Sequence, residues 1–290
     1  FAGLSAALAL GRARRTVLVI DSGKPCNQPT PHSHNFLTQD GAVPAAIRTA
    51  GKNQVLAYPT VHFITGTVLR ITGSDFAFSI QTAANETYFA KKILFATGIT
   101  DLLPAIPGFA ACWGKSVIHC PFCHGYEVKD EPTGLLLPAD NPMDYIALVA
   151  NWTNQLTVFT NGTMPFSPEE QTLLAAKNIR LEKERIRDLQ HSGGQVAAIQ
   201  LENDSTVALK ALYARVPFRQ HTDLPAMLGC KLTDDGYIQT GSLQHTTVPG
   251  VFAAGDNASR LRTVSNAVAA GTAAGIAINK ELTDHSFFHF

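Results

Sequence analysis

The chain has 290 residues, and its 23 lysines and arginines balance its 23 aspartates and glutamates, so the formal net charge is zero. A balanced charge argues against nucleic acid or an anionic membrane surface as a partner. Hydrophobic residues make up 45% of the chain and charged residues 16%, as in a globular protein with a large interior, and the length favours two domains. No segment approaches the roughly 20 consecutive apolar residues that span a bilayer, so the expected location is cytoplasmic.

The first predicted elements are a helix rich in small residues at 1–10 and a short apolar strand that ends at Asp21. They form the second half of a βαβ dinucleotide-binding unit, with Gly3 at the close-packing position and Asp21, followed by Ser22, where a carboxylate accepts hydrogen bonds from a ribose. The first strand and the first two glycines of such a unit are absent, which predicts an N-terminal truncation of about a dozen residues. An ordinary packing helix before a strand is the alternative.

Alternating residues then predict a small antiparallel layer, at 62–71, 76–81 and 87–90. A buried strand follows and ends on a glycine turn made of Ala96, Thr97 and Gly98. A second α/β stretch begins near residue 114, before the chain returns to a buried strand and a long helix at 264–282. The prediction is an α/β fold of two Rossmann-like, three-layer domains: a discontinuous one at 1–111 and 232–290, and an inserted one at 112–231.

The returning strand ends on Gly255 and Asp256, where the next helix should begin. A carboxylate at the carboxyl end of a buried strand can hold a cofactor hydroxyl, while the amino end of the following helix faces phosphate or ring oxygens. The alternative is an ordinary strand-to-helix turn in which Asp256 caps the helix. Because Gly3, Asp21 and the turn at Gly98 precede it in the expected order, the sequence favours a cofactor site.

Five cysteines are too few for a disulfide framework, and three of them, Cys26, Cys112 and Cys230, are expected to be buried or incidental thiols. Cys120 and Cys123 form a C-x-x-C pair, whose spacing allows a short, reactive disulfide, especially at the amino end of a helix. The alternatives are an inert pair and a zinc site completed by flanking histidines. Without a second C-x-x-C we predict no metal.

Residues 96–98, residues 119–127 (His-Cys-Pro-Phe-Cys-His-Gly-Tyr-Glu) and the stretch ending at Asp256 together resemble the thioredoxin-reductase family of FAD-dependent pyridine nucleotide-disulfide oxidoreductases. The resemblance runs from residue 1 to about 282 and is greatest to the branch of ferredoxin- or flavin-dependent reductases and gliotoxin-type dithiol oxidases. It implies FAD in the discontinuous domain, a redox cysteine pair in the inserted domain, and a homodimer. It also implies that Cys123 faces the flavin and that Cys120 exchanges with the substrate.

The same resemblance suggests roles for further residues. His124 stands where relatives carry an aspartate acting as acid/base, and imidazole, which titrates near neutrality, suits that role; His119 is expected to assist or merely to pack. His34 and Asn35 lie in a loop that relatives bring near the flavin, or else cap that loop. Asn266 and Ala267 begin the flavin-facing helix, although Ser265 and Asn266 replace an Arg-Gln pair there, which puts those contacts in doubt. The predicted cofactor-binding residues are Gly3, Asp21, Ser22, His34, Asn35, Ala96, Thr97, Gly98, Gly255, Asp256, Asn266 and Ala267.

The inserted domain departs from the family at the expected nicotinamide site. After its first strand, residues 138–143 read Pro-Ala-Asp-Asn-Pro-Met instead of a glycine-rich turn, which removes amide donors and adds a negative charge and bulk. Residues 160–165 offer no arginine for a 2′-phosphate. We therefore expect conventional NAD(P)H binding to be lost, unless the backbone geometry survives these residue types.

The function predicted from these features is an FAD-dependent thiol/disulfide oxidoreductase that exchanges electrons between the flavin and Cys120–Cys123. Its partners would be a thioredoxin-like protein or a small dithiol or disulfide, with ferredoxin or flavodoxin as electron donor. Alternatives are an oxygen-dependent dithiol oxidase and a non-catalytic flavin-binding scaffold or sensor. The aromatic tail at 285–290 is expected to cover the flavin through Phe287, Phe288 or Phe290, or else to pack in a dimer or be disordered.

Overall fold

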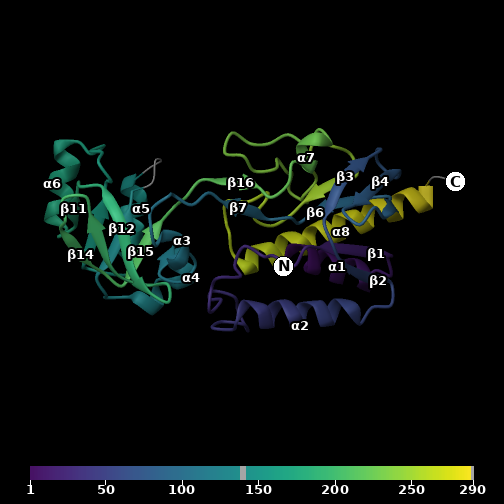
Figure 1. The fold of residues 1–290 in the computed structure, drawn as a ribbon. Coiled ribbons are helices and arrows are strands. Elements are labelled where there is room, and N and C mark those ends of the chain that lie inside the picture. The colour runs from purple at the N-terminus through teal and green to yellow at the C-terminus, as the bar shows by residue number, and fades with distance from the viewer. Residues whose placement is uncertain (138–141, 289–290) are drawn as a thin grey trace. The chain divides into compact units, whose positions relative to one another are not determined.

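The computed structural model describes residues 1–137 and 142–288 (Figure 1). Within these ranges the chain forms two compact units, one built from residues 1–28, 35–100 and 219–290 and the other from residues 29–34 and 101–218. The chain therefore crosses between the units at 100/101 and 218/219, whereas the motifs suggested crossings near 111 and 231. Around these crossings, β7 (Ile99–Asp101) and β16 (Phe218–Gln220) pair as a two-stranded sheet.

The first unit opens with α1 (Ala2–Arg12), β1 (Val17–Asp21), α2 (Pro44–Leu56) and β2 (Val61–Thr65). The strands β1 and β2 are parallel and in register from Val17↔Val61 to Asp21↔Thr65, so α2 is the crossover between them. Residues 62–71 were expected in one antiparallel layer, but Val61–Thr65 instead pairs with β1. The chain then leaves this pair at Gly66, whose N–H donates to the carbonyl of Asp21 at 3.0 Å.

The predicted antiparallel layer begins one strand later, as the meander β3 (Val68–Thr72), β4 (Phe78–Thr82) and β5 (Thr87–Ala90). The buried strand β6 (Ile93–Phe95) pairs in parallel with β17 (Val251–Ala253), so that the two predicted cofactor turns lie at the ends of neighbouring strands. Between β16 and β17 lies the short helix α7 (Leu224–Met227).

The long helix α8 (Val264–Phe288) completes the first unit and packs against α1 through very small residues. A Cβ on Gly271 would lie 2.1 Å from the carbonyl oxygen of Ala2, so the backbones of the two helices are in close contact there. This helix continues through the segment that was expected to be a separate tail. Phe287 and Phe288 therefore lie on its last turn, where both are exposed.

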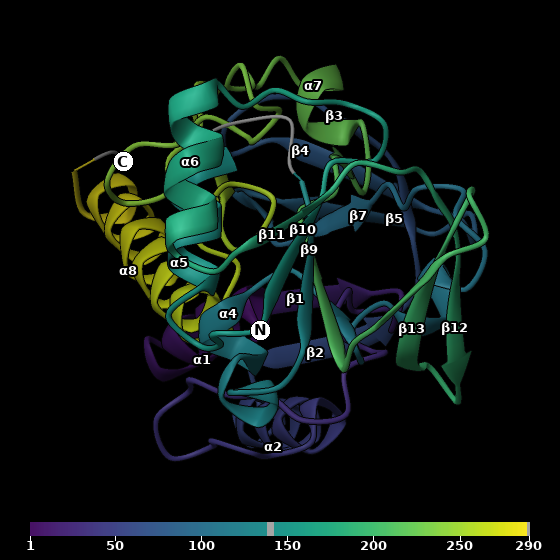
Figure 2. The same cartoon turned by 90° about the vertical axis from the view of Figure 1, so that its left-hand side faces the viewer.

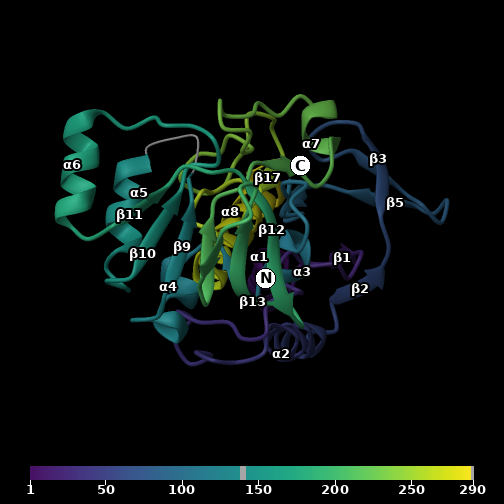
Figure 3. The same cartoon turned by 60° about the vertical axis from the view of Figure 1, so that its left-hand side comes forward.

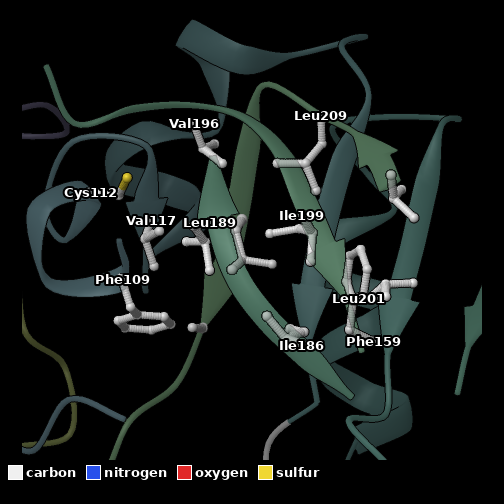
Figure 4. Close-up of a cluster of buried hydrophobic side chains, with 13 residues drawn as sticks. Phe109, Cys112, Val117, Phe159, Ile186, Leu189, Val196, Ile199, Leu201 and Leu209 are labelled. Atoms are coloured by element: carbon white, nitrogen blue, oxygen red, sulfur yellow. The ribbon is translucent and has the colours of Figure 1, made fainter. Parts of the chain in front are cut away.

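The second unit contains a parallel five-stranded sheet between two different covering layers (Figures 2 and 3). Two helices, α5 (Pro142–Val149) and α6 (Pro168–Ala176), pack on one face, around Tyr145, Ile146 and Leu174. An antiparallel meander packs on the other face, around Ile199, Leu201 and Phe159 (Figure 4). The sheet order is β11 (Arg180–Glu182), β10 (Leu156–Phe159), β9 (Thr133–Leu136), β15 (Ala211–Ala214), β8 (Val117–Ile118), and the meander is β12 (Ile186–Ser192), β13 (Gln195–Leu201), β14 (Thr206–Ala208).

Together the parallel sheet, the helices and the meander make the three-layer α/β arrangement that the sequence predicted. Three short helical turns, α3 (Phe109–Cys112), α4 (Pro121–His124) and the 3₁₀ turn η1 (Tyr126–Val128), flank β8. Over the residues that the structure describes, no helix is both long enough and apolar enough to cross a membrane.

Candidate functional site

The cysteine pair lies in the second unit, directly after the buried strand β8. Cys120 has an extended backbone (φ −123°, ψ 109°) at the amino end of α4, and Pro121 supplies the fixed φ that suits a first helical position. Cys123 donates its N–H to the carbonyl of Cys120 at 3.2 Å, which brings the two Cα atoms to 5.3 Å. The sulfurs are joined in a disulfide. The strand-to-helix turn therefore presents a formed C-x-x-C disulfide at the edge of a rigid sheet.

His124 follows the disulfide in the same turn of helix. Burial lowers the pKa of His124 below its usual 6.5, while the charge of Glu127 raises it and His34 lowers it further. A lowered pKa leaves the imidazole neutral at pH 7, so His124 can accept a proton from a thiol. The environment of His124 thus suits the acid/base role that the resemblance implies for it.

His34 lies in the disulfide unit, because residues 29–34 group with residues 101–218. Its Nε2 is 3.4 Å from Oε1 of Glu127. Asn35 belongs to the other unit, where its N–H donates to the carboxylate of Asp40 at 2.7 Å. The boundary between the two units therefore runs between these two neighbours, and their flavin contacts stay predictions.

His119 packs rather than facing the disulfide openly. Its ring stacks on Trp113 with centroids 6.0 Å apart, and its carbonyl accepts a hydrogen bond from the buried hydroxyl of Tyr145 at 3.0 Å. Burial raises the pKa of Tyr145 to about 12, so this hydroxyl remains a donor at any ordinary pH. His119 thereby anchors the strand end from which Cys120 emerges.

Exposed aromatic side chains surround the disulfide. Phe122, between the two cysteines, is 61% exposed, and Tyr126 is 69% exposed. Phe122 meets the ring of Trp152 edge-on at 5.3 Å, and the ammonium of Lys129 lies 3.5 Å from the centre of the Tyr126 ring. Phe122 and Tyr126 are part of the motif at 119–127, whereas Trp152 comes from a distant turn after α5. The disulfide is thus bordered by an aromatic surface that sequence reasoning did not identify.

The predicted cofactor carboxylates gather in the first unit near the amino end of α1. Asp21 accepts the N–H of Gly23 at 2.9 Å, and Asp256 lies 3.5 Å from the sulfur of Cys26. Cys26 is exposed, unlike Cys112 and Cys230, which are buried as expected.

The turns that follow β6 and β17 leave room for a cofactor. Gly98 (φ +67°) has open space where a Cβ would stand, and Gly255 (φ +96°) has only the Cβ of Ala2 nearby, at 3.2 Å. Asn257, fully buried, donates to the carbonyl of Phe95 at 2.9 Å, while its Oδ1 has no partner among the described residues. Glycine turns, two carboxylates and a buried acceptor without a partner fit the phosphates and hydroxyls of FAD.

Two residues at the start of α8 that were predicted to contact the flavin make contacts within the protein. Asn266 donates its side-chain amide to the carbonyl of Leu261 at 2.8 Å and to the hydroxyl of Ser259 at 3.2 Å. Ala267 is buried against Ala2 and Ala254. Asn266 therefore holds the preceding loop together, and Ala267 fills the contact between α1 and α8. Nearby, Ala96 occupies the space beside Gly3, at 3.3 Å from the position of a Cβ there.

The expected loss of a nicotinamide site falls largely on residues 138–141, which lie outside the described residues. Of the described part, Pro142 begins α5 and Met143 packs against the hydrophobic cluster beneath that helix. The turn after β10 contains no arginine, and Arg185 from a later segment lies against Gly162, within 2.9 Å of where a Cβ would be. Among the described residues, no group of three or more histidine, cysteine, aspartate or glutamate side chains could hold a metal ion.

Comparison with known proteins agrees with this architecture. The family model of pyridine nucleotide-disulphide oxidoreductases matches residues 1–143 and 154–271. Thioredoxin reductase tcpT of Claviceps purpurea is 31% identical, over 94% of this chain and 89% of its own, and thioredoxin reductase sirT of Leptosphaeria maculans is 32% identical, over 96% and 90%. An oxidoreductase from Agrobacterium tumefaciens superposes with a TM-score of 0.92 at 35% identity, over 97% of this chain and 95% of its own.

These matches cover almost the whole chain, and they include both the disulfide turn and the glycine turns described above. The cofactor of the family is FAD. The chain therefore belongs to the pyridine nucleotide-disulphide oxidoreductase family and is an FAD-dependent, thioredoxin-reductase-like disulfide oxidoreductase.

Proposed function

We propose that the chain passes two electrons between FAD and the Cys120–Cys123 disulfide without conventional NAD(P)H binding, and that its partner is a thioredoxin-like protein or a small dithiol or disulfide. The observation that carries the proposal is the disulfide itself, formed at the amino end of α4 beside a neutral His124. Ferredoxin or flavodoxin would act as electron donor. A homodimer in the cytoplasm is part of the same proposal.

With a dithiol substrate, the exchange at the disulfide takes two steps. One substrate thiol gives its proton to His124 and its sulfur attacks Cys120, which breaks the Cys120–Cys123 bond and releases Cys123 as a thiolate. The second substrate thiol then displaces Cys120, so that the substrate leaves as a disulfide and two cysteine thiols remain after two protons are returned. Run in the other direction, the same steps reduce a substrate disulfide. When bound, FAD supplies the two-electron partner of the cysteine pair.

In our assignment, residues 1–111 and 232–290 would bind FAD, and residues 112–231 would carry the redox pair. Asp21 and Ser22 would hold the adenosine ribose, Asp256 a ribityl hydroxyl, and the turns at Gly98 and Gly255 the phosphates and ring edge. Support comes from the open space at Gly98 and from the buried Oδ1 of Asn257, which needs a donor. Gly3, Ala96, Thr97, Asn266 and Ala267 would shape the site around them.

A dithiol oxidase is the second candidate. The exposed rings of Phe122 and Tyr126, with the half-buried Trp152 edge-on to Phe122, favour it, because exposed apolar rings suit an apolar small molecule. In that case the substrate dithiol would be oxidised and molecular oxygen reduced to hydrogen peroxide.

The test is anaerobic reduction of the purified holoprotein by NADPH, NADH and dithiothreitol in turn, followed by admission of air. Reduction of the flavin by dithiothreitol alone is the expected result, and rapid reoxidation in air would favour the oxidase. Reduction by NADPH at catalytic speed would refute the loss of nicotinamide binding. A Cys120→Ser variant that still transfers electrons to a disulfide would refute the thiol mechanism.

A further inference from the structure

Three titratable side chains from two distant chain segments meet beside the disulfide: His124, Glu127 and His34. The segment 29–34 is anchored in the disulfide unit, since a Cβ on Gly114 would lie 3.3 Å from both Pro29 and Thr30. His34 Nε2 then lies 3.4 Å from Glu127, with the His34 side chain 19% and the Glu127 side chain 41% exposed. A loop far from the C-x-x-C motif in sequence thus supplies part of its surroundings.

The backbone of the motif brings Glu127 to the same side as His124. Gly125 donates to the carbonyl of Pro121 at 2.7 Å and Val128 donates to the carbonyl of Gly125 at 3.3 Å, so α4 runs directly into η1. Residues three apart on such a helical segment are neighbours on its surface. A side chain on Gly125 would come within 2.8 Å of Trp152, so only glycine lets this turn pack so closely.

The charges around His124 act in opposite directions. The carboxylate of Glu127 raises the pKa of His124 and His34 lowers it, while burial lowers it most. His34 itself faces Glu127 and, across 6.5 Å between ring centroids, His32. Burial raises the pKa of Tyr213, and the charges of Tyr145 and Glu127 raise it further; the buried Tyr213 hydroxyl has no partner among the described residues. The protonation of His124 therefore depends on a carboxylate and a second histidine.

We propose that Glu127 and His34 are positioning residues that set the protonation of His124 and carry its proton to solvent during thiol–disulfide exchange. His124 takes the proton of the attacking thiol as the new sulfur–sulfur bond forms and the Cys120–Cys123 bond breaks. The imidazolium so formed is stabilised by the Glu127 carboxylate, and the partly exposed His34 relays the proton outward. This inference rests on the proposed function and adds two residues to it, neither of which touches the reacting sulfur atoms.

The first test needs no substrate, so its outcome is independent of the proposed function. The titration of His124 would be followed by NMR in oxidised holoprotein with labelled histidine, in the variants Glu127→Gln and His34→Gln. Matched controls are Glu131→Gln and His191→Gln, which change an exposed carboxylate and an exposed histidine elsewhere in the same unit. Circular dichroism would establish that each variant is folded.

Loss of the carboxylate should lower the His124 midpoint by about 0.5 to 1 pH unit, and loss of His34 should raise it, whereas the controls should leave it in place. Opposite shifts are the decisive result, because a general loosening of the fold would move both variants in one direction. Unchanged midpoints, or shifts of the same sign, would overturn the proposal.

The second measurement is the pH profile of flavin reduction by dithiothreitol in the same set of proteins. The inflection of this profile should follow the His124 midpoint in each variant. Glu127→Asp, which keeps a carboxylate, should bring the inflection part of the way back to that of the parent. If dithiothreitol reduces no variant, including the parent, the proposed function fails while the NMR result stands. If dithiothreitol reduces the parent, but the pH profiles of Glu127→Gln and Glu131→Gln have the same inflection, the proposed role of Glu127 and His34 is refuted and the proposed function stands.

Discussion

Helices α1 and α8 of the first unit and helix α5 of the second unit have very different surroundings. In the first unit α1 and α8 meet through alanine and glycine, and Gly98 and Gly255 leave open turns at the ends of β6 and β17. In the second unit α5 carries the buried ring of Tyr145, and the guanidinium of Arg215, just after β15, lies 3.9 Å from its centre. Large side chains therefore stand in the second unit where small ones stand in the first.

This difference shows how one layered architecture can serve two purposes. Small residues let the backbone approach a dinucleotide closely, so the first unit suits FAD. Aromatic and cationic side chains instead fill the layer around α5 and stabilise a rigid sheet whose edge carries the disulfide. The five predictions below test this division, in order of decreasing effect.

Cys120→Ser should have the largest effect, because it removes the reactive thiol from the second unit and leaves the first unit intact. We expect disulfide exchange to fall about 1,000-fold or more, since a hydroxyl cannot replace a thiolate as nucleophile or leaving group. The measurement is the reduction rate of a disulfide substrate by chemically reduced enzyme. Cys26→Ser is the matched control, and a comparable loss there would place the reactive thiol in the first unit.

Gly271→Ala should damage the first unit alone. The added Cβ would stand 2.1 Å from the carbonyl oxygen of Ala2, so α1 and α8 must separate. We expect a loss of about 3 kcal/mol in the free energy of unfolding, with release of FAD, measured by denaturant titration and flavin fluorescence. Gly241→Ala, where nothing lies within 4 Å, should be neutral. Equal stability of the two variants would contradict the close packing of these helices.

Asp256→Asn tests the cofactor assignment directly. Loss of a charged acceptor for a cofactor hydroxyl should weaken FAD binding about 10- to 100-fold, measured by calorimetric titration of the apoprotein. Asp204→Asn, an exposed carboxylate in the second unit, should bind FAD as the parent does. The assignment fails if both variants bind FAD equally well.

Phe122→Ala tests the aromatic surface beside the disulfide. We expect KM for an apolar dithiol to rise about 5- to 10-fold with little change in kcat, because the exposed ring contributes binding area and no chemistry. Phe89→Ala removes a phenylalanine of the first unit that is 82% exposed, more than Phe122, and should change neither constant. A fall in kcat at constant KM would mean that Phe122 shapes the disulfide instead.

The smallest expected effect concerns pH. The pKa of His124 is lower in the folded protein than in the unfolded chain, so the unfolded chain binds more protons as the pH falls below about 6.5. Folding stability should therefore decrease on acidification through this range. His124→Gln should flatten that decrease, measured as the denaturation midpoint at several pH values. A parallel decrease in parent and variant would assign it to other groups.

Sequence patterns predicted the parts of the fold that are formed by residues close to one another in the chain. The apolar strand that ends on Asp21, the glycine turn at Gly98 and the disulfide at Cys120–Cys123 each depend on residues within a few positions of one another. Pairing partners were harder to predict. Residues 61–65 alternate in a manner that suits either sheet type, and only their contact with β1 places them in a parallel pair. Residues 206–216 likewise divide between the meander and the main sheet.

The parts of the site that escaped prediction are those assembled from distant segments. Nothing near His34 in sequence indicates Glu127, and nothing near Phe122 indicates Trp152, because both contacts form only when the second unit folds. Asn257 follows Asp256 directly, yet its buried, half-satisfied amide is visible only once β6 lies beside it. Arg185 reaches Gly162 across the sheet end, so a search of one turn for a basic residue missed it.

Because β7 pairs with β16, the two ends of the inserted segment 102–217 lie next to each other. The N–H of Leu102 donates to the carbonyl of Pro217 at 2.8 Å, so the inserted segment begins and finishes at almost the same point. A short linker could join residues 102 and 217 to each other, or join the two flanking parts of the chain. The segment 102–217 could therefore be exchanged for that of a relative through two neighbouring junctions, whereas residues 29–34, which also belong to the second unit, would stay with the flavin-binding chain.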